Sequence, residues 1–281
     1  MQTHFMARPL PDGIGSRASW SVHPKGKAIV FVHGFKGSAL GTWLEFPRLL
    51  QQMKEFAGCD LIFYGYDGAR MRATNSAYWL RVFLKEVVEN PSKLANQTLW
   101  VPRPLNFSYD AVVICAHSLG AVVSRQALLD AHLSKEKWVS KTRLVLFAPA
   151  HLGASILPLV YESMGALPIN FRLVPTGGIM RLLLVLLVFA TKLRWRVLQD
   201  LEPRCLALKK LLKDSLKAIN DGNANFLIAP AVLHAANDDI VHPIRFAEDL
   251  PHEVIPGKSH TQACKPSGTF LQPVEAVKKL L

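Results

Sequence analysis

The sequence predicts an α/β fold with a mostly parallel central sheet flanked by helices. Six short apolar runs, rich in β-branched residues, have the character of buried strands, and helical patterns lie between them. Strands that alternate with helices are joined by crossovers, which produce parallel strand pairs. The expected strands are Ala28–Val32, Asp60–Tyr66, Ala111–Cys115, Leu144–Ala148, Ala231–Ala235 and Glu253–Ile255.

Apolar residues recur at helical spacing in three segments of the first half of the chain. These expected helices are Trp43–Phe56, Ala77–Val88 and Leu119–Leu133. The second ends at Asn90-Pro91, because a proline disfavours the helical conformation in the residue before it. Asn96–Tyr109, which contains two prolines, is expected to be a loop.

The alternation of strands and helices breaks between residues 156 and 224, which we expect to form a helical cap. Within it, the helical pattern Arg204–Ile219 gathers leucines on one face and lysines on much of the other. Between Glu162 and Asp221, ten basic residues stand against five acidic ones. The expected division is therefore an N-terminal extension at 1–24, a core at 25–155 and 225–281, and the cap at 156–224.

The composition excludes several classes of protein. Of the 281 residues 50% are hydrophobic and 19% are charged, which is typical of a packed globular chain rather than a disordered one. The net charge of +12 permits contact with nucleic acid, anionic lipid or acidic partners. The basic residues are spread along the chain without interleaved aromatic residues, so we expect no nucleic-acid partner.

The sequence also bears on location and cofactors. The longest apolar run, Leu182–Ala190, is far shorter than the roughly 20 residues that a membrane-spanning helix needs. Met1–Ser21 lacks the apolar region of a signal peptide, so we expect a cytoplasmic protein with reduced thiols. Its four cysteines form no C-x-x-C pair and its histidines show no zinc spacing, so we expect neither a metal nor another cofactor.

The sharpest local signal is Ala116-His117-Ser118-Leu119-Gly120, between an expected strand and an expected helix. Small residues two before and two after Ser118 allow the sharp turn of a nucleophile elbow, although Ala116 stands where glycine is usual. Such a turn exposes the serine hydroxyl above the sheet. The alternative is a serine that merely caps a helix. The neighbouring Cys115 and His117 are expected to pack rather than react.

A serine hydroxyl is a poor nucleophile without a base and without donors for the oxyanion. The loop His33-Gly34-Phe35 follows an early strand, and we expect the backbone amides of Phe35 and Leu119 to form the oxyanion hole. His33 itself is expected to brace the loop. His-Gly is also a common strand-ending turn.

The acid and the base must follow the serine, in that order. The strand Ala231–Ala235 leads to Asp238 and Asp239, of which we prefer Asp238 as the acid, while an Asx turn remains an alternative. His260 follows the last expected strand, and we expect it to be the base. His242, four residues after Asp238, is expected to open a helix instead.

With these residues in place, the sequence resembles the α/β-hydrolase superfamily of serine esterases and lipases. Phe63-Tyr64-Gly65-Tyr66-Asp67 and Ala148-Pro149-Ala150-His151-Leu152-Gly153 resemble stretches of a lipase-like subgroup that includes SERAC-type proteins, although Ala150 departs from its pattern. The resemblance spans about 25–155 and 225–281 and leaves the cap uncovered.

The resemblance implies hydrolysis of a carboxylic ester through Ser118, His260 and Asp238, with a small-molecule ester as substrate. The apolar faces Ile179–Ala190 and Leu208–Ile219 favour a hydrophobic acyl group, and the basic face favours peripheral contact with an anionic membrane. The alternatives are a helix pair with solvated lysines and, for the whole chain, a catalytically silent binding module. The sequence leaves the acyl length, the leaving group and the oligomeric state open.

Overall fold

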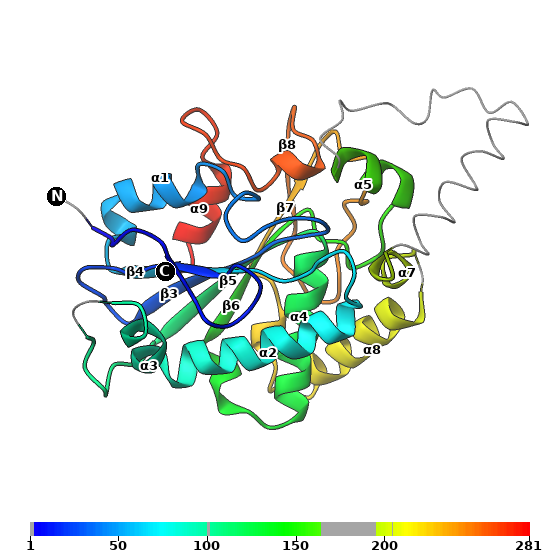
Figure 1. Ribbon diagram of the computed structural model, residues 1–281. Helices are drawn as coiled ribbons and strands as arrows, with labels where there is room; N and C mark the ends of the chain where they lie inside the picture. The colour runs from blue at the N-terminus through cyan, green and yellow to red at the C-terminus, as the bar shows by residue number, and fades with distance from the viewer. Residues whose placement is uncertain (1–2, 100–101, 164–194, 204) are drawn as a thin grey trace, which may run out of the picture.

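The computed structural model describes residues 3–99, 102–163, 195–203 and 205–281. One eight-stranded sheet organises these residues, in the order β1-β2-β4-β3-β5-β6-β7-β8 (Figure 1). Strands β3 to β8 run parallel, whereas β1 and β2 are antiparallel at one edge. The strands are β1 (Arg8–Pro9), β2 (Arg17–Ser19), β3 (Lys27–Val32), β4 (Cys59–Tyr64), β5 (Ala111–His117), β6 (Thr142–Phe147), β7 (Ala231–Ala235) and β8 (Glu253–Ile255).

The predicted α/β class with a mostly parallel sheet is confirmed. Each of the six expected strands is present, with ends that shift by at most two residues. Strands β1 and β2 were not expected, because they lie in the segment assigned to an extension before the core. Both are too short to show the alternation of a strand, and β2 is recognised by its pairing of Ala18 with Ile62.

Helices cover both faces of the sheet. In Figure 1, α1 and α9 lie above the sheet, whereas α2, α4 and α8 lie below it. The α-helices of the described residues are α1 (Phe46–Gln52), α2 (Ala73–Glu89), α3 (Pro91–Asn96), α4 (Leu119–Leu133), α5 (Ile156–Ser163), α7 (Val197–Asp200), α8 (Leu206–Asn220) and α9 (Gln272–Lys278).

Two helical expectations need correction, and one helix was not expected. The segment 43–56 is not one helix, because Leu44 has a φ of 47° and Met53 is extended, so α1 ends at Gln52 and a separate 3-10 turn follows. Helix α3 occupies Pro91–Asn96, before the expected loop, because proline is well tolerated in a first helical turn. His242 opens no helix.

The segment that we expect to form a cap lies between β6 and β7. Its helix α8 buries Leu208, Leu211 and Ile219 and packs against α4, while Lys209 and Lys213 face solvent. This is the amphipathic pattern expected from the sequence. The expected acyl-pocket face Ile179–Ala190 lies outside the described residues. Every helix that the structure describes is too short or too polar to cross a bilayer.

Candidate active site

Ser118 occupies a strained turn where β5 meets α4. Its φ of 53° and ψ of −120° lie in a region that side chains disfavour. The backbone is held there by its neighbours: the Ser118 amide donates to the carbonyl of Phe147 over 3.0 Å, and the Ala150 amide donates to the Ser118 carbonyl over 3.3 Å. The Ser118 side chain makes no capping bond to α4. The helix-cap interpretation therefore fails, and the geometry is that of an elbow.

Two glycines allow the elbow to approach the loop after β3. A Cβ on Gly120 would lie 2.3 Å from the carbonyl oxygen of Val32 and 2.5 Å from that of His33. A Cβ on Gly34 would lie 2.9 Å from the Cβ of Ser118. All three distances are well inside van der Waals contact, so glycine is required at each position for this close approach.

The structure brings Ser118, His260 and Asp238 together in one hydrogen-bonded series. His260 Nε2 lies 2.9 Å from Ser118 Oγ, and His260 Nδ1 lies 2.8 Å from Asp238 Oδ2. Asp238 sits in the loop after β7, and His260 begins η5 (His260–Gln262) after β8. The carboxyl ends of parallel strands meet at one edge of the sheet. Ser118 and His260 are 142 residues apart in the sequence, and they lie in contact because both follow strands that end at this edge.

Asp238 is fixed as the partner of His260. Its other oxygen, Oδ1, accepts hydrogen bonds from the amides of Ile240 and Val241 at 2.9 and 3.0 Å. Burial alone would raise the pKa of Asp238, but the charge of His260 and these hydrogen bonds hold the pKa below its ordinary value. The carboxylate therefore stays ionised beside the imidazole. Of the two adjacent aspartates, it is Asp238 that contacts His260.

Two groups beside the nucleophile are held in their neutral forms. Burial, followed by the charge of His260, lowers the pKa of His117 to about 3. Neutral His117 places Nε2 3.1 Å from the carbonyl oxygen of His260, so it steadies the backbone of that histidine. Burial raises the pKa of the Cys115 thiol well above its ordinary value, which leaves no thiolate at neutral pH.

The loop His33-Gly34-Phe35 is braced from the end of β4 by a tyrosine that sequence reasoning did not single out. Tyr66 donates its hydroxyl proton to the carbonyl of His33 over 2.8 Å, and the two rings stack at 4.5 Å. Burial lowers the pKa of His33 to about 4, so its ring is neutral. Phe35 is buried, with the ring of Trp195 edge-on at 5.6 Å. The sequence signal that could have pointed to Tyr66 was its place in the stretch Gly65-Tyr66-Asp67.

A buried ion pair fastens the helix behind the nucleophile to the loop before β8. Arg125, on α4, is fully buried and donates to both carboxylate oxygens of Asp249, at 2.9 and 2.7 Å.

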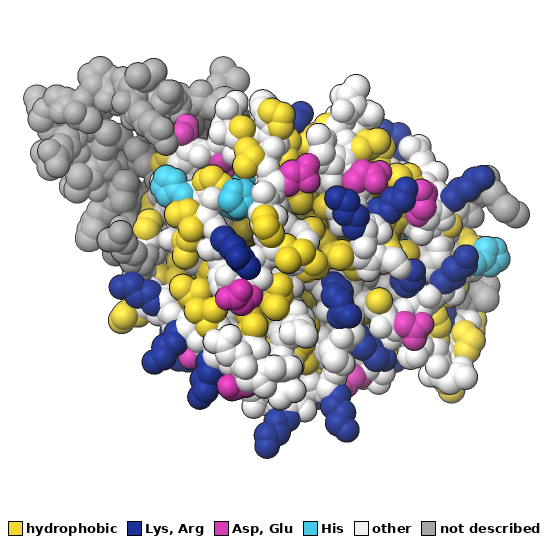
Figure 2. Space-filling model, turned by 180° about the vertical axis from the view of Figure 1, so that it is seen from behind, with side chains coloured by type: hydrophobic (Ala, Val, Ile, Leu, Met, Phe, Trp, Pro, Cys, Tyr) yellow, Lys and Arg dark blue, Asp and Glu magenta, His cyan; other side chains and the backbone are white. Residues whose placement is uncertain are grey.

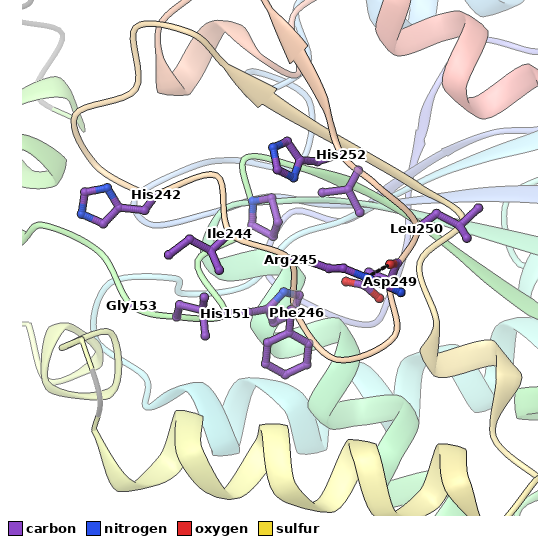
Figure 3. A pocket seen from close by; sticks show the side chains of 12 residues that line it. His151, Gly153, His242, Ile244, Arg245, Phe246, Asp249, Leu250 and His252 are labelled. Atoms are coloured by element: carbon purple, nitrogen blue, oxygen red, sulfur yellow. Dashed lines mark hydrogen bonds between the residues drawn. The ribbon is translucent and has the colours of Figure 1, made fainter.

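Figure 3 shows Asp249 with Phe246 and His151 around a small cavity of about 10 Å³. The Phe246 and His151 rings lie 4.5 Å apart. Such a cavity has room for one water molecule.

Nothing in the described residues is arranged to hold a metal. No cluster of three or more histidine, cysteine, aspartate or glutamate side chains with ligand geometry occurs in the part of the chain that the structure covers. The chemistry that the site offers there is that of a hydroxyl, an imidazole and a carboxylate in contact.

Comparison with known proteins yields structural relatives only. No protein-family model and no curated protein sequence matches the chain. Among solved structures, the chain is similar to the mature lipase BlEst2 of Bacillus licheniformis, at 14% identity and a TM-score of 0.56, with 100% of both chains covered. It is also similar to the esterase RhEst1 of Rhodococcus sp. ECU1013, at 13% identity and a TM-score of 0.51, with 98% of this chain and 99% of that one covered.

These likenesses run along the whole length of the chain at low identity, so they bear on the fold. The resemblance to the SERAC-type subgroup stays a prediction. The strand order, the flanking helices and the solved structures agree on one architecture, and the chain has the α/β-hydrolase fold.

Proposed function

We propose that this protein is a serine hydrolase that cleaves carboxylic esters. The observation that carries the proposal is the contact series from Ser118 Oγ to His260 Nε2 and from His260 Nδ1 to Asp238, at 2.9 and 2.8 Å. These distances lie within the reach that proton transfer requires. The strained backbone of Ser118 adds support, because such strain persists mainly where function needs it.

In the first half of the reaction, His260 accepts the Ser118 hydroxyl proton as the oxygen attacks the ester carbonyl carbon. Asp238 orients the imidazole and stabilises the imidazolium that forms. Collapse of the tetrahedral intermediate breaks the ester C–O bond, and His260 returns the proton to the leaving alcohol. The products are an acyl-enzyme on Ser118 and the free alcohol.

Water then attacks the acyl-enzyme, with His260 again the base, and releases the acid. In both halves the amides of Phe35 and Leu119 are our candidates for the oxyanion donors. Leu119 is the first residue of α4, so no intrahelical acceptor is available to its N–H. Each donor should contribute about 3 kcal/mol in the transition state.

We place the acyl group in a groove of about 650 Å³ beside the acid loop, although Ser118, Asp238 and His260 do not themselves line it. Leu208 and Leu212 of α8 form one wall, and Ile240, two residues from Asp238, lies on the other. This volume falls within the usual range for small-molecule sites. The leucine and isoleucine side chains of this lining support an ester with an aliphatic acyl chain as the substrate.

Contact with an anionic membrane is a further part of the proposal. The exposed lysines of α8, such as Lys209 and Lys213, support it together with Leu206, which is 84% exposed. Basic side chains are also dispersed over the face shown in Figure 2. After flotation with anionic vesicles at low salt, the protein should be recovered with the vesicles. A protein that stays entirely in the dense fraction would contradict the proposed membrane contact.

The test of the proposed function is hydrolysis of p-nitrophenyl esters of increasing acyl length by wild type and Ser118→Ala. We expect activity that rises from acetyl toward medium chains and falls at least about a thousandfold in the variant. A folded wild type with no activity on any chain length would favour the silent binding module. A maximum rate with the acetyl ester would contradict the proposed aliphatic acyl pocket but not the proposal that the protein is a serine hydrolase.

A further inference from the structure

A second groove lies between α2 and the loop that joins β1 to β2. Its volume is about 780 Å³, within the range of small-molecule sites. It shares no lining residue with the groove beside the acid loop, and Ser118, Asp238 and His260 do not line it. A ligand of this groove can therefore be inferred independently of the proposed hydrolase function.

The walls of the groove leave large apolar side chains in water. Ile14, Trp79 and Val82 line it and are 65%, 55% and 45% exposed. Ile14 comes from the loop and the other two from α2, so the exposed groups face one opening from both sides. Contiguous apolar surface of this kind marks a ligand groove more often than scattered single residues do.

The floor of the groove is preformed. It consists of buried aromatic rings, with Tyr64 at 4.7 Å from Phe83 and at 5.7 Å from Tyr66. Tyr66 is anchored by its hydrogen bond to the carbonyl of His33, and the loop is tied down by the amide of Ile14, which donates to the carbonyl of Gly65 over 2.7 Å. A ligand therefore has little ordering to perform on binding.

One polar group of this floor lacks a protein partner. Tyr64 lines the groove and is only 2% exposed, yet its hydroxyl forms no hydrogen bond within the described part of the chain. Burial, followed by the charge of Asp12, raises the pKa of Tyr64, so the hydroxyl stays protonated and can donate. The hydroxyl oxygen is not one of the fully buried unpaired polar atoms of the described residues, so it is open to the groove, where a ligand oxygen can accept its hydrogen bond in place of water.

The charged residues around the groove cancel. Asp12 and Glu86 stand against Lys85 and Lys93, and Glu86 already pairs with Lys93 at 2.8 Å. A groove whose lining has no net charge does not attract an ion more strongly than a neutral molecule. Because an ion loses more hydration energy when it enters the groove, the groove favours the neutral molecule.

We propose that this groove binds an uncharged, apolar molecule that carries one carbonyl oxygen, of the class of aliphatic esters and ketones. The chain lies along Ile14, Trp79 and Val82, and the carbonyl oxygen accepts a hydrogen bond from Tyr64.

The test is calorimetric titration of the Ser118→Ala protein, in which the probe cannot be turned over, with methyl octanoate. Octanoate and octylammonium serve as charged probes of the same length. We expect the ester to bind more tightly than either ion. Tyr64→Phe, which keeps the ring, should weaken ester binding about three- to tenfold. Tyr78→Phe is the matched control, because Tyr78 is an exposed tyrosine of α2 outside the groove, and it should change nothing.

A second variant separates this groove from the candidate active site, which is also expected to bind the ester. Val82→Glu places a charge in the wall at an exposed position, so the fold should tolerate it, and of the two ester-binding events only that of the candidate active site should remain. An ester isotherm that neither Tyr64→Phe nor Val82→Glu changes would place all of the binding elsewhere and overturn the proposal. Absence of ester binding, or equal binding of octanoate, would overturn it as well.

Discussion

Gly120→Ala tests the close approach between the nucleophile turn and the loop after β3. Gly120 is the second residue of α4, and its Cα faces the backbone of that loop. An added methyl group would lie 2.3 Å from the carbonyl oxygen of Val32 and 2.5 Å from that of His33. Both obstacles are backbone atoms of a buried strand end, so neither can rotate away as a side chain would.

The size of the effect follows from these distances. Ordinary contact between heavy atoms begins near about 3.5 Å, so α4 and the loop must separate by roughly 1 Å. Overpacking of this kind costs about 1–3 kcal/mol of folding free energy. The same shift would move Ser118 relative to Phe35, and misplacement by about 1 Å lowers catalytic rates by about a hundredfold.

Two measurements check this prediction: the free energy of unfolding in urea, and kcat/KM on a p-nitrophenyl ester. Gly268→Ala is the matched control, since a Cβ there meets no atom within 4 Å and the backbone φ is not positive. The control should match wild type in both measurements. A Gly120→Ala protein with wild-type stability and wild-type kcat/KM would refute the steric reasoning.

Three other contacts lead to further predictions. Asp238→Asn should lower kcat by about ten-thousandfold, because the imidazole loses the group that orients it. Asp239→Asn is the control and should leave kcat near wild type. Equal losses in steady-state assays would contradict the assignment of the acid. Arg125→Leu leaves Asp249 buried without its partner and should lower the free energy of unfolding in urea by about 3–5 kcal/mol. Arg48→Leu, at an exposed ion pair, should lower it by less than about 1 kcal/mol. Similar losses in the two variants would show that burial does not matter here. Burial, followed by the charge of His252, lowers the pKa of His234 to about 4, so between pH 6.5 and 4 the unfolded chain binds a proton that the folded chain excludes. Stability should therefore fall as the pH falls across that window, by up to about 1.4 kcal/mol per unit from this group, and His234→Phe should make the decline shallower; an unchanged slope would contradict the burial of this ring.

The sequence predicted the central strands and the boundaries of α4 well, because buried parallel strands and the helices between them carry strong hydrophobic patterns. Ala231–Ala235 and Leu119–Leu133 match the structure residue for residue. It missed β1 and β2, because two or three residues carry too little pattern, and their place in the sheet comes from the pairing of β2 with β4 and of β1 with β2.

The candidate site was accessible from sequence for a different reason. Elements that end at the same edge of a parallel sheet bring their following loops together, so the chain order of Ser118, Asp238 and His260 was informative. Sequence could not find the bond of Tyr66 to the His33 carbonyl, since that bond depends on the register of β3 against β4. Nor could it choose firmly between neighbouring aspartates, whose side chains differ only in direction.

The most direct test of the central claim is labelling with a fluorophosphonate, which reacts with an activated serine hydroxyl. We expect one adduct on the wild-type protein, located by peptide mass spectrometry at Ser118, and none on a folded Ser118→Ala variant. His260→Ala should slow the labelling sharply, because the hydroxyl loses its base. A folded wild type that takes no label, or a Ser118→Ala protein labelled as fast as wild type, would contradict the account.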